Sequence, residues 1–165
     1  MDTEIQKKLL KSAGAFLARR AQSRGELRAK LEKIADKALV EAALDRLEQL
    51  HLLNDAEYAY NFALCRMKQD GWGRIKIRES LIHRQVPESA IQLAIERARS
   101  ELDEESALLE YLKRRFLKKK LPEDPNVLRK LVVHLRRRGF DEENISRVLK
   151  RMFPAELMQH LDTGE

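Results

Sequence analysis

The residue types that usually carry chemistry are present in this chain, but their spacing forms no catalytic or metal-binding motif. The histidines lie far apart, at His51, His83, His134 and His160, whereas a zinc site needs ligands at short, regular spacings. Gly71-Trp72-Gly73 lacks the third glycine of a dinucleotide-binding fingerprint, and no phosphate-binding G-x-x-x-x-G-K-[ST] occurs. The sequence therefore predicts that the protein is not an enzyme and has no cofactor and no metal.

Carboxylates are plentiful, but helix surfaces account for them better than acid–base catalysis does. Glu41, Asp45 and Glu48 follow one another at three- and four-residue spacing, which places them on one helical face. A second cluster occupies residues 101–105, where it would suit a helix N-terminus. Both groups are expected to be solvated rather than catalytic.

The basic residues give a more specific signal, because they are unevenly distributed. The formal net charge is +6. Residues 1–112 hold equal numbers of basic and acidic side chains, whereas residues 113–151 hold 14 basic against 5 acidic ones. A surface that serves only solubility normally mixes positive and negative charges. The basic segment therefore predicts an anionic partner, either a nucleic acid or an acidic protein surface.

Two pairs of arginines recur at an interval of fifty residues, Arg24 with Arg28 and Arg74 with Arg78. Each pair spans one helical turn, so a repeated architecture could present both on a common side. Together with the bases of the third repeat they form the predicted contact set. This set comprises Arg24, Arg28, Arg74, Lys76, Arg78, Arg114, Arg115, Lys118, Lys119, Arg129, Lys130, Arg136, Arg137 and Arg138.

Two single residues have alternative interpretations. Trp72 could stack on a base, although closing the seam between neighbouring bundles is the favoured interpretation. Cys65 follows Phe62, Ala63 and Leu64, which predicts a small buried hydrophobe in a reducing compartment. No apolar stretch is long enough to span a membrane and no export signal begins the chain, so a cytoplasmic protein is expected.

The elements that must position these residues are helices. Apolar residues recur at helical spacing throughout, and sustained strand alternation is absent. Ser23 with Glu26 predicts a capping box, and Asn54 with Glu57 predicts the start of a later helix.

The helical pattern repeats about every fifty residues, since Leu31, Leu81 and Leu135 occupy equivalent places. We expect an all-α, elongated, curved array of three tandem three-helix bundle repeats. The expected segments are repeats at 1–53, 54–102 and 103–152, followed by a short acidic C-terminal tail at 153–165. A single compact all-α domain with coincidental spacing is the alternative.

Two motifs carry a family resemblance. A-R-R-x-x-S-R-x-E-L begins at Ala18, and L-N-D-x-x-Y-A-x-x-F begins at Leu53. In a chain of three three-helix units, these motifs resemble the RecX family of bacterial recombination regulators. The third unit matches only as a basic helical pattern.

The resemblance implies a negative regulator of a RecA-type recombinase. Such a protein binds in the groove of the recombinase filament on single-stranded DNA, inhibits its ATPase, strand-exchange and co-protease activities, and limits filament growth. The implied partners are the recombinase filament and, by direct contact, single-stranded DNA, with no membrane and with the protein as a monomer. A direct DNA-binding regulator of helix-turn-helix type, acting without a recombinase, is one alternative. A scaffold that acts only on proteins is another.

Overall fold

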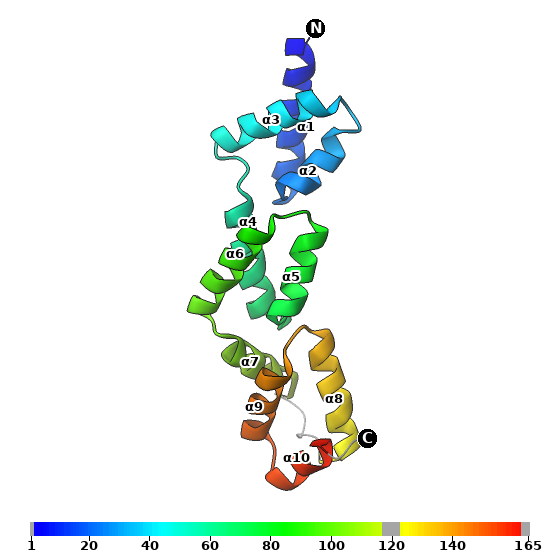
Figure 1. Ribbon diagram of the computed structural model, residues 1–165, viewed down its shortest axis with the longest axis vertical. Coiled ribbons are helices and arrows are strands. Elements are labelled where there is room, and N and C mark those ends of the chain that lie inside the picture. Colours follow the sequence, from blue (N-terminus) through cyan, green and yellow to red (C-terminus); the bar gives the residue numbers. More distant parts are fainter. Residues whose placement is uncertain (1, 117–122, 163–165) are drawn as a thin grey trace. The chain divides into compact units, whose positions relative to one another are not determined.

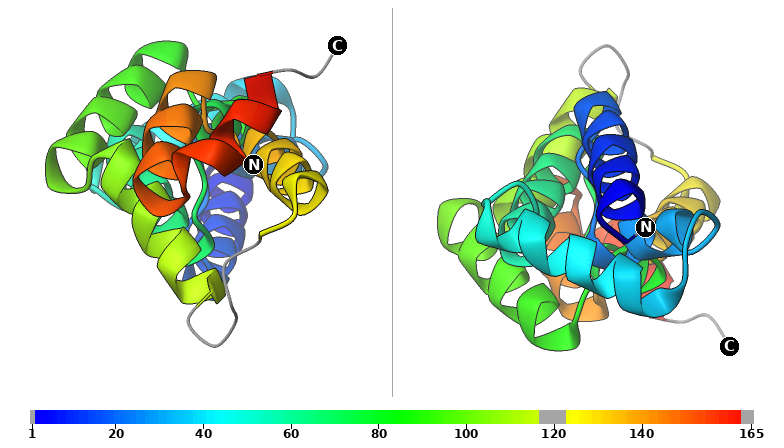
Figure 2. Two further views of the ribbon diagram at one scale, coloured as in Figure 1. Left: turned by 90° about the horizontal axis from the view of Figure 1, so that it is seen from below. Right: turned by 90° about the horizontal axis from the view of Figure 1, so that it is seen from above.

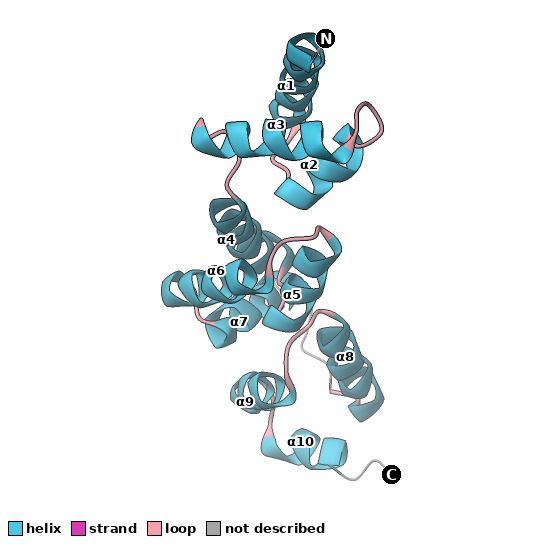
Figure 3. Ribbon diagram, turned by 45° about the horizontal axis from the view of Figure 1, so that its top comes forward, coloured by secondary structure: helices cyan, strands magenta, loops and turns pink. Residues whose placement is uncertain are grey.

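The computed structural model describes residues 2–116 and 123–162, and this part of the chain consists of helices and connecting loops (Figures 1 and 3). The all-α prediction is therefore confirmed. The helices are α1 (Asp2–Arg19), α2 (Arg24–Leu31), α3 (Lys37–Gln49), α4 (Asp55–Cys65), the π-helical turn η1 (Arg66–Asp70), α5 (Arg74–His83), α6 (Glu88–Glu101), α7 (Glu104–Phe116), α8 (Pro125–Arg137), α9 (Glu142–Met152) and α10 (Ala155–Asp162).

Packing divides the chain into two compact units. Unit 1 comprises residues 1–61 and 80–94, and unit 2 comprises residues 62–79 and 95–165. Helices α4, α5 and α6 each contribute one end to each unit. The division into three repeats concerns sequence repetition rather than packing, so its boundaries stay a prediction.

Unit 1 is built on a bundle of α1, α2 and α3, and Figure 2 shows α1 crossing α3. The core collects the apolar residues whose spacing predicted the helices, among them Leu9, Leu31 and Leu44, all fully buried. The predicted capping box at Ser23 and Glu26 is confirmed in both directions. The side chain of Asn54 accepts a hydrogen bond from the Glu57 amide at 3.0 Å, as expected at the start of α4.

Unit 2 has its core among α7, α8 and α9, with α10 packed against α8 and α9 (Figure 2). Leu112, Leu135 and Phe140 are among its buried residues. The helix α10 lies in the segment predicted to be only an acidic tail. It packs because Leu157 and Met158 contact the core of the unit.

The same joint occurs once in each unit: a left-handed turn docks against the N-terminus of a middle helix. In unit 1 the Ser23 hydroxyl donates to the Arg84 carbonyl beside Gln85, whose φ is 56°. In unit 2 the Gly73 amide donates to the Arg138 carbonyl at 2.8 Å, beside Gly139, whose φ is 85°. A repeated joint of this kind follows from the repeated sequence.

A carboxylate from the next helix completes each joint. The Arg24 amide donates to Asp55 Oδ1 at 2.7 Å, and the Arg74 amide donates to Glu104 Oε1 at 2.8 Å. Asp55 is the first residue of α4, and Glu104 is the first residue of α7. Burial raises the pKa of both carboxyls. Each carboxylate satisfies an amide that would otherwise lack a partner at a helix N-terminus.

The prediction of a buried Cys65 is wrong, because this cysteine is exposed. Ala59, Ala63 and Met67 form the buried stripe at four-residue spacing. Cys65 is two residues from Ala63, so it points away from that stripe. The apolar residues next to Cys65 in the sequence therefore do not indicate that Cys65 lies on the buried face of the helix.

We predict opposite effects of one substitution at two glycines of unit 1. At Gly25 an added Cβ would overlap the side chain of Gln85, whereas at Gly14 in α1 it would meet nothing within 4 Å. Gly25→Ala should lower the free energy of unfolding by about 1–3 kcal/mol. Gly14→Ala should raise it by about 0.5–1 kcal/mol, because alanine favours the helix. Denaturant unfolding followed by far-UV circular dichroism measures both, and equal effects would contradict the close approach at Gly25.

Candidate functional site

The predicted contact residues Arg24 and Arg28 are held by carboxylates of the same unit. Arg24 forms ion pairs with Glu41 at 2.7 Å, Asp45 at 2.7 Å and Glu48 at 2.8 Å, and its side chain is only 18% exposed. Arg28 also pairs with Glu41. Hydrogen bonds from Arg28 and Arg24 lower the pKa of the Glu41 carboxyl to about 2. The acidic face predicted to be simply solvated thus binds α3 to α2.

Arg74 and Arg136 also have carboxylate partners. Arg74 lies 2.8 Å from Asp141 and 3.6 Å from Glu104. Asp141 in turn caps α9 by accepting from the Asn144 amide at 2.8 Å. Arg136 pairs with Glu142 on the surface. These contacts assign structural roles to Arg74 and Arg136 alongside any partner contact.

The remaining predicted residues differ in their surroundings. Lys118 and Lys119 lie outside the described residues. Arg78 is exposed on α5, and Arg129 is exposed on α8 and donates to Asn126. Six others have no carboxylate within 4.0 Å in the described part of the chain, and we call them the carboxylate-free cations. They are Lys76, Arg114, Arg115, Lys130, Arg137 and Arg138.

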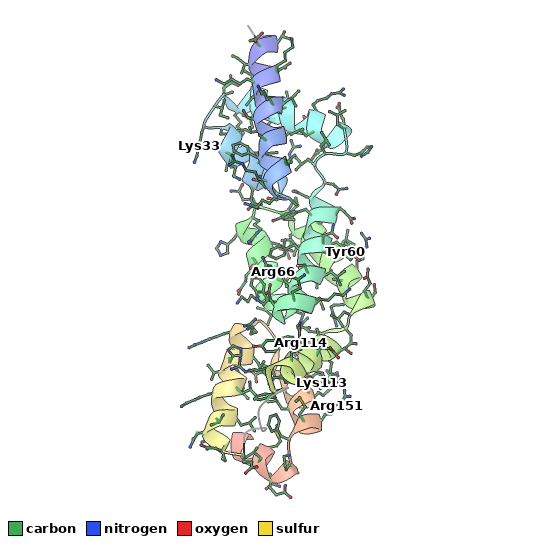
Figure 4. All side chains as sticks on the ribbon, turned by 180° about the vertical axis from the view of Figure 1, so that it is seen from behind. Lys33, Tyr60, Arg66, Lys113, Arg114 and Arg151 are labelled. Carbon is green, nitrogen blue, oxygen red and sulfur yellow. The ribbon has the colours of Figure 1, made fainter. Side chains whose placement is uncertain are left out.

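All six carboxylate-free cations belong to unit 2, where they come from α5, α7, α8 and the residue that follows α8. Lys113, Arg114 and Arg115 occupy the last turn of α7, so they also complement the negative end of its helix dipole. Arg114 donates to the Lys68 carbonyl at 2.7 Å, which joins α7 to η1. The helix α7 contacts η1, and Figure 4 labels Arg66 of η1 and Lys113 and Arg114 of α7. Four of these predicted cations, Lys76, Arg115, Arg137 and Arg138, lie in one region of unit 2, around His134.

Trp72 lies within this region and is already covered by cations. The ammonium of Lys76 lies 4.4 Å from the centre of the indole, and the guanidinium of Arg66 lies 5.0 Å from it. Phe62 contacts the ring edge-on, with centroids 6.2 Å apart. A base could stack on a cation-covered face of Trp72 only by displacing that cation.

A second aromatic group, which we call the Tyr111 cluster, lies between α7 and α8. It consists of Tyr111, Arg115, His134 and Arg138. The Tyr111 hydroxyl and His134 Nε2 share a hydrogen bond of 2.7 Å, and their rings are stacked. Arg115 donates to the same hydroxyl at 3.3 Å, and the Arg138 guanidinium lies 4.9 Å from the Tyr111 ring centre.

Burial, and then the charges of nearby cations, lower the pKa of His134. These cations are Arg115, Arg138, Lys76 and Arg137. The imidazole is therefore neutral at pH 7, and the region around it carries an excess of positive charge. Such an arrangement attracts an anion, and its aromatic rings suit a partner with planar groups.

Sequence reasoning had missed Tyr111 and His134. A signal was present, because Tyr111 stands one helical turn before Arg115 and His134 one turn before Arg138. Within the described residues, no group of three His, Cys, Asp or Glu side chains is placed to hold a metal ion. Nor is any described helix both long and apolar enough to cross a bilayer.

Comparison with known proteins shows which family this chain resembles. A family model described as "RecX, second three-helix domain" matches residues 54–95. The regulatory protein RecX of Prosthecochloris aestuarii is 32% identical over 153 residues, which cover 92% of this chain and 97% of the relative. That of Pseudomonas entomophila is 36% identical over 140 residues, covering 84% of this chain and 88% of the relative.

Solved structures agree in fold. The crystal structure of RecX from Lactobacillus salivarius matches with a TM-score of 0.71 at 19% identity, covering 91% of this chain and 97% of that one. Another crystal structure of a regulatory protein RecX matches with a TM-score of 0.58 at 21% identity, covering 99% of this chain and 74% of that one. Both matches support the helical architecture.

The ion pairs of Glu41 generate a prediction about acid stability. The folded-state pKa of about 2 lies below the ordinary value of 4.5, so the stabilisation is complete above pH 4.5 and is lost as the pH falls towards 2. At pH 7, Glu41→Gln should lower the free energy of unfolding by about 1–2 kcal/mol, because the pairs are partly exposed. The difference from the parent protein should shrink to nearly zero at pH 2.

Denaturant unfolding at several pH values tests this, with Glu32→Gln at an exposed position of the same unit as the control. The control should change stability by less than about 0.5 kcal/mol at every pH. A Glu41→Gln effect that persists undiminished at pH 2 would show that the loss of charge is not its cause.

Proposed function

Because the chain belongs to the RecX family, we propose that it is a negative regulator of a RecA-type recombinase. It binds in the groove of the filament that the recombinase forms on single-stranded DNA. There it inhibits ATP hydrolysis, strand exchange and co-protease activity, and it limits filament growth. This is the role that the motifs at Ala18 and Leu53 imply.

The observation that carries this proposal is the gathering of the carboxylate-free cations in unit 2. A nucleoprotein filament is rich in phosphate groups, and cations without internal partners are the ones able to neutralise them. Arg24 and Arg28 contribute less to this surface, because three carboxylates of α3 already neutralise them. Unit 2 therefore makes the main electrostatic contacts.

No covalent step is required for such a regulator. A protein that binds the assembled filament and the free recombinase with different affinities shifts the equilibrium by that difference alone. Repeated three-helix segments suit this role, since several weak contacts on one polymer add through their effective concentration.

The third helices of the second and third repeats, α6 and α9, do not favour the helix-turn-helix alternative. Recognition helices of that class contact bases with their N-terminal residues. In this chain α6 begins with Glu88, and α9 begins with Glu142 and Glu143. Carboxylates at these positions would repel the phosphate backbone that flanks the groove.

We predict that removing three carboxylate-free cations weakens inhibition. The variant Arg115→Gln, Lys130→Gln, Arg137→Gln changes exposed residues of unit 2. The concentration needed to halve single-stranded DNA-dependent ATP hydrolysis by a RecA-type recombinase should rise about tenfold or more. The loss should be greatest at low salt, because screening already weakens the contacts at high salt.

The matched control is Lys7→Gln, Lys8→Gln, Lys11→Gln, which removes the same charge from exposed positions of α1 in unit 1. Its half-inhibitory concentration should stay within about twofold of that of the parent protein. The control lowers the overall charge by the same amount but leaves the cations of unit 2 in place. Equal loss in both triple variants would contradict the special role of unit 2. Tight, sequence-specific binding to duplex DNA without any recombinase would favour the helix-turn-helix alternative instead.

A further inference from the structure

The Tyr111 cluster has an unusual charge balance for a half-buried histidine. Cations face His134 from three helices and one helix end. They are Lys76 from α5, Arg115 from α7, Arg137 from α8 itself, and Arg138, which follows α8. The nearby carboxylate of Asp70 is bound by Arg66. Within the described residues, none of these four cations has a carboxylate partner. The cluster therefore presents positive charge that the unit itself does not neutralise.

The hydrogen bonds of the cluster have a direction. Arg115 donates to the phenol oxygen of Tyr111, so the phenol hydrogen is available to donate to Nε2 of the neutral His134. If His134 takes up a proton, Nε2 becomes a donor to the phenol oxygen. The Tyr111 O–H must then turn away from His134 and can donate to an external acceptor.

Protonation would thus add both a positive charge and an outward donor to the cluster. Arg138 uses one N–H on the Asp70 carbonyl and Arg115 uses one on Tyr111. Because a guanidinium has five N–H donors, both arginines retain donors for another oxyanion. The combination matches the oxygens of a phosphate group.

We propose that the Tyr111 cluster binds one phosphodiester group of single-stranded DNA and that His134 takes up a proton as the phosphate binds. This inference rests on the proposed function, since it assigns the nucleic acid strand as the ligand of the basic region in unit 2. The phosphate supplies the negative charge that the cluster lacks. The Tyr111 O–H donates to one of its non-bridging oxygens.

The pH dependence follows from linkage. In the free protein the pKa of His134 is lowered from 6.5 by burial and by the surrounding cations, so the ring is neutral at pH 8. A bound phosphate offsets those cations and raises this pKa. Affinity for DNA therefore rises as the pH falls through the pKa of the complex, and it levels off below the pKa of the free protein.

We predict that oligothymidylate raises the pKa of His134 by about one unit, measured from the NMR signals of the histidine rings. The affinity of the full chain for this oligonucleotide, measured by fluorescence anisotropy, should rise about threefold or more between pH 8 and pH 6, and it should approach a limit of about tenfold at lower pH. His134→Gln should abolish most of this rise.

Two further variants separate this effect from loss of structure. His83→Gln removes an exposed histidine of α5 outside the cluster and should retain the pH dependence. Arg115→Gln changes an exposed side chain and should reduce the slope of log affinity against log salt by about one. Unchanged far-UV circular dichroism establishes that each variant is folded.

Several results would overturn the inference. One is DNA binding without any change in the titration of His134. Another is a larger shift with ADP or inorganic phosphate than with oligothymidylate at equal phosphate concentration, which would indicate a site for a free phosphate compound. A third is a shift caused by a recombinase without DNA but not by DNA, which would indicate an acidic protein surface.

A parallel ATPase assay distinguishes this inference from the proposed function. Inhibition of the recombinase without proton uptake on DNA binding would refute only the phosphate site. Proton uptake with oligothymidylate in a protein that inhibits no recombinase would refute only the regulatory role and would support the site.

Discussion

The first backbone amide of each docked middle helix requires a partner, and much of the architecture depends on how that partner is supplied. In α2 and α5 it is a carboxylate from the first residue of the helix that opens the following segment. Burial makes the carboxylate costly to ionise, as the raised pKa values of Asp55 and Glu104 indicate. The amide and the carboxylate are therefore satisfied only together, and the docking turn must approach closely enough to cover them.

This constraint also determines where the candidate site lies. The close approach of Gly73 to Gly139 brings the end of α8 against the start of α5, since a Cβ at Gly73 would overlap the backbone of Gly139 and one at Gly139 would overlap Lys76. His134 lies in the last turn of α8, Arg138 follows the last residue of this helix, and Lys76 lies in the first turn of α5. The basic and aromatic side chains are neighbours because the joint needs two glycines.

Helical periodicity and capping chemistry are local in sequence, and for that reason the helices, the box at Ser23 and the start of α4 could be predicted. The contacts that distinguish neutralised arginines from the others join residues that are far apart in the sequence. Arg24 and Glu41 are 17 residues apart and meet only because α2 packs on α3. A charge count cannot distinguish an arginine neutralised in this way from Arg137, which has no carboxylate beside it among the described residues. The pairing of Tyr111 with His134 could not be predicted for the same reason, because their hydrogen bond joins α7 to α8 across 23 positions of the sequence.

Because each joint takes its partners from residues far ahead in the sequence, it sets an order for synthesis on the ribosome. The Arg24 amide of α2 bonds to a carboxylate 31 positions later in the sequence, and the Ser23 hydroxyl bonds to a carbonyl 61 positions later. When α1, α2 and α3 first leave the exit tunnel, the N-terminus of α2 is still uncapped by these groups. These bonds form only after the turn at Gln85 has emerged, so the time that residues 54–86 take to leave the exit tunnel sets how long the N-terminus of α2 lacks these partners.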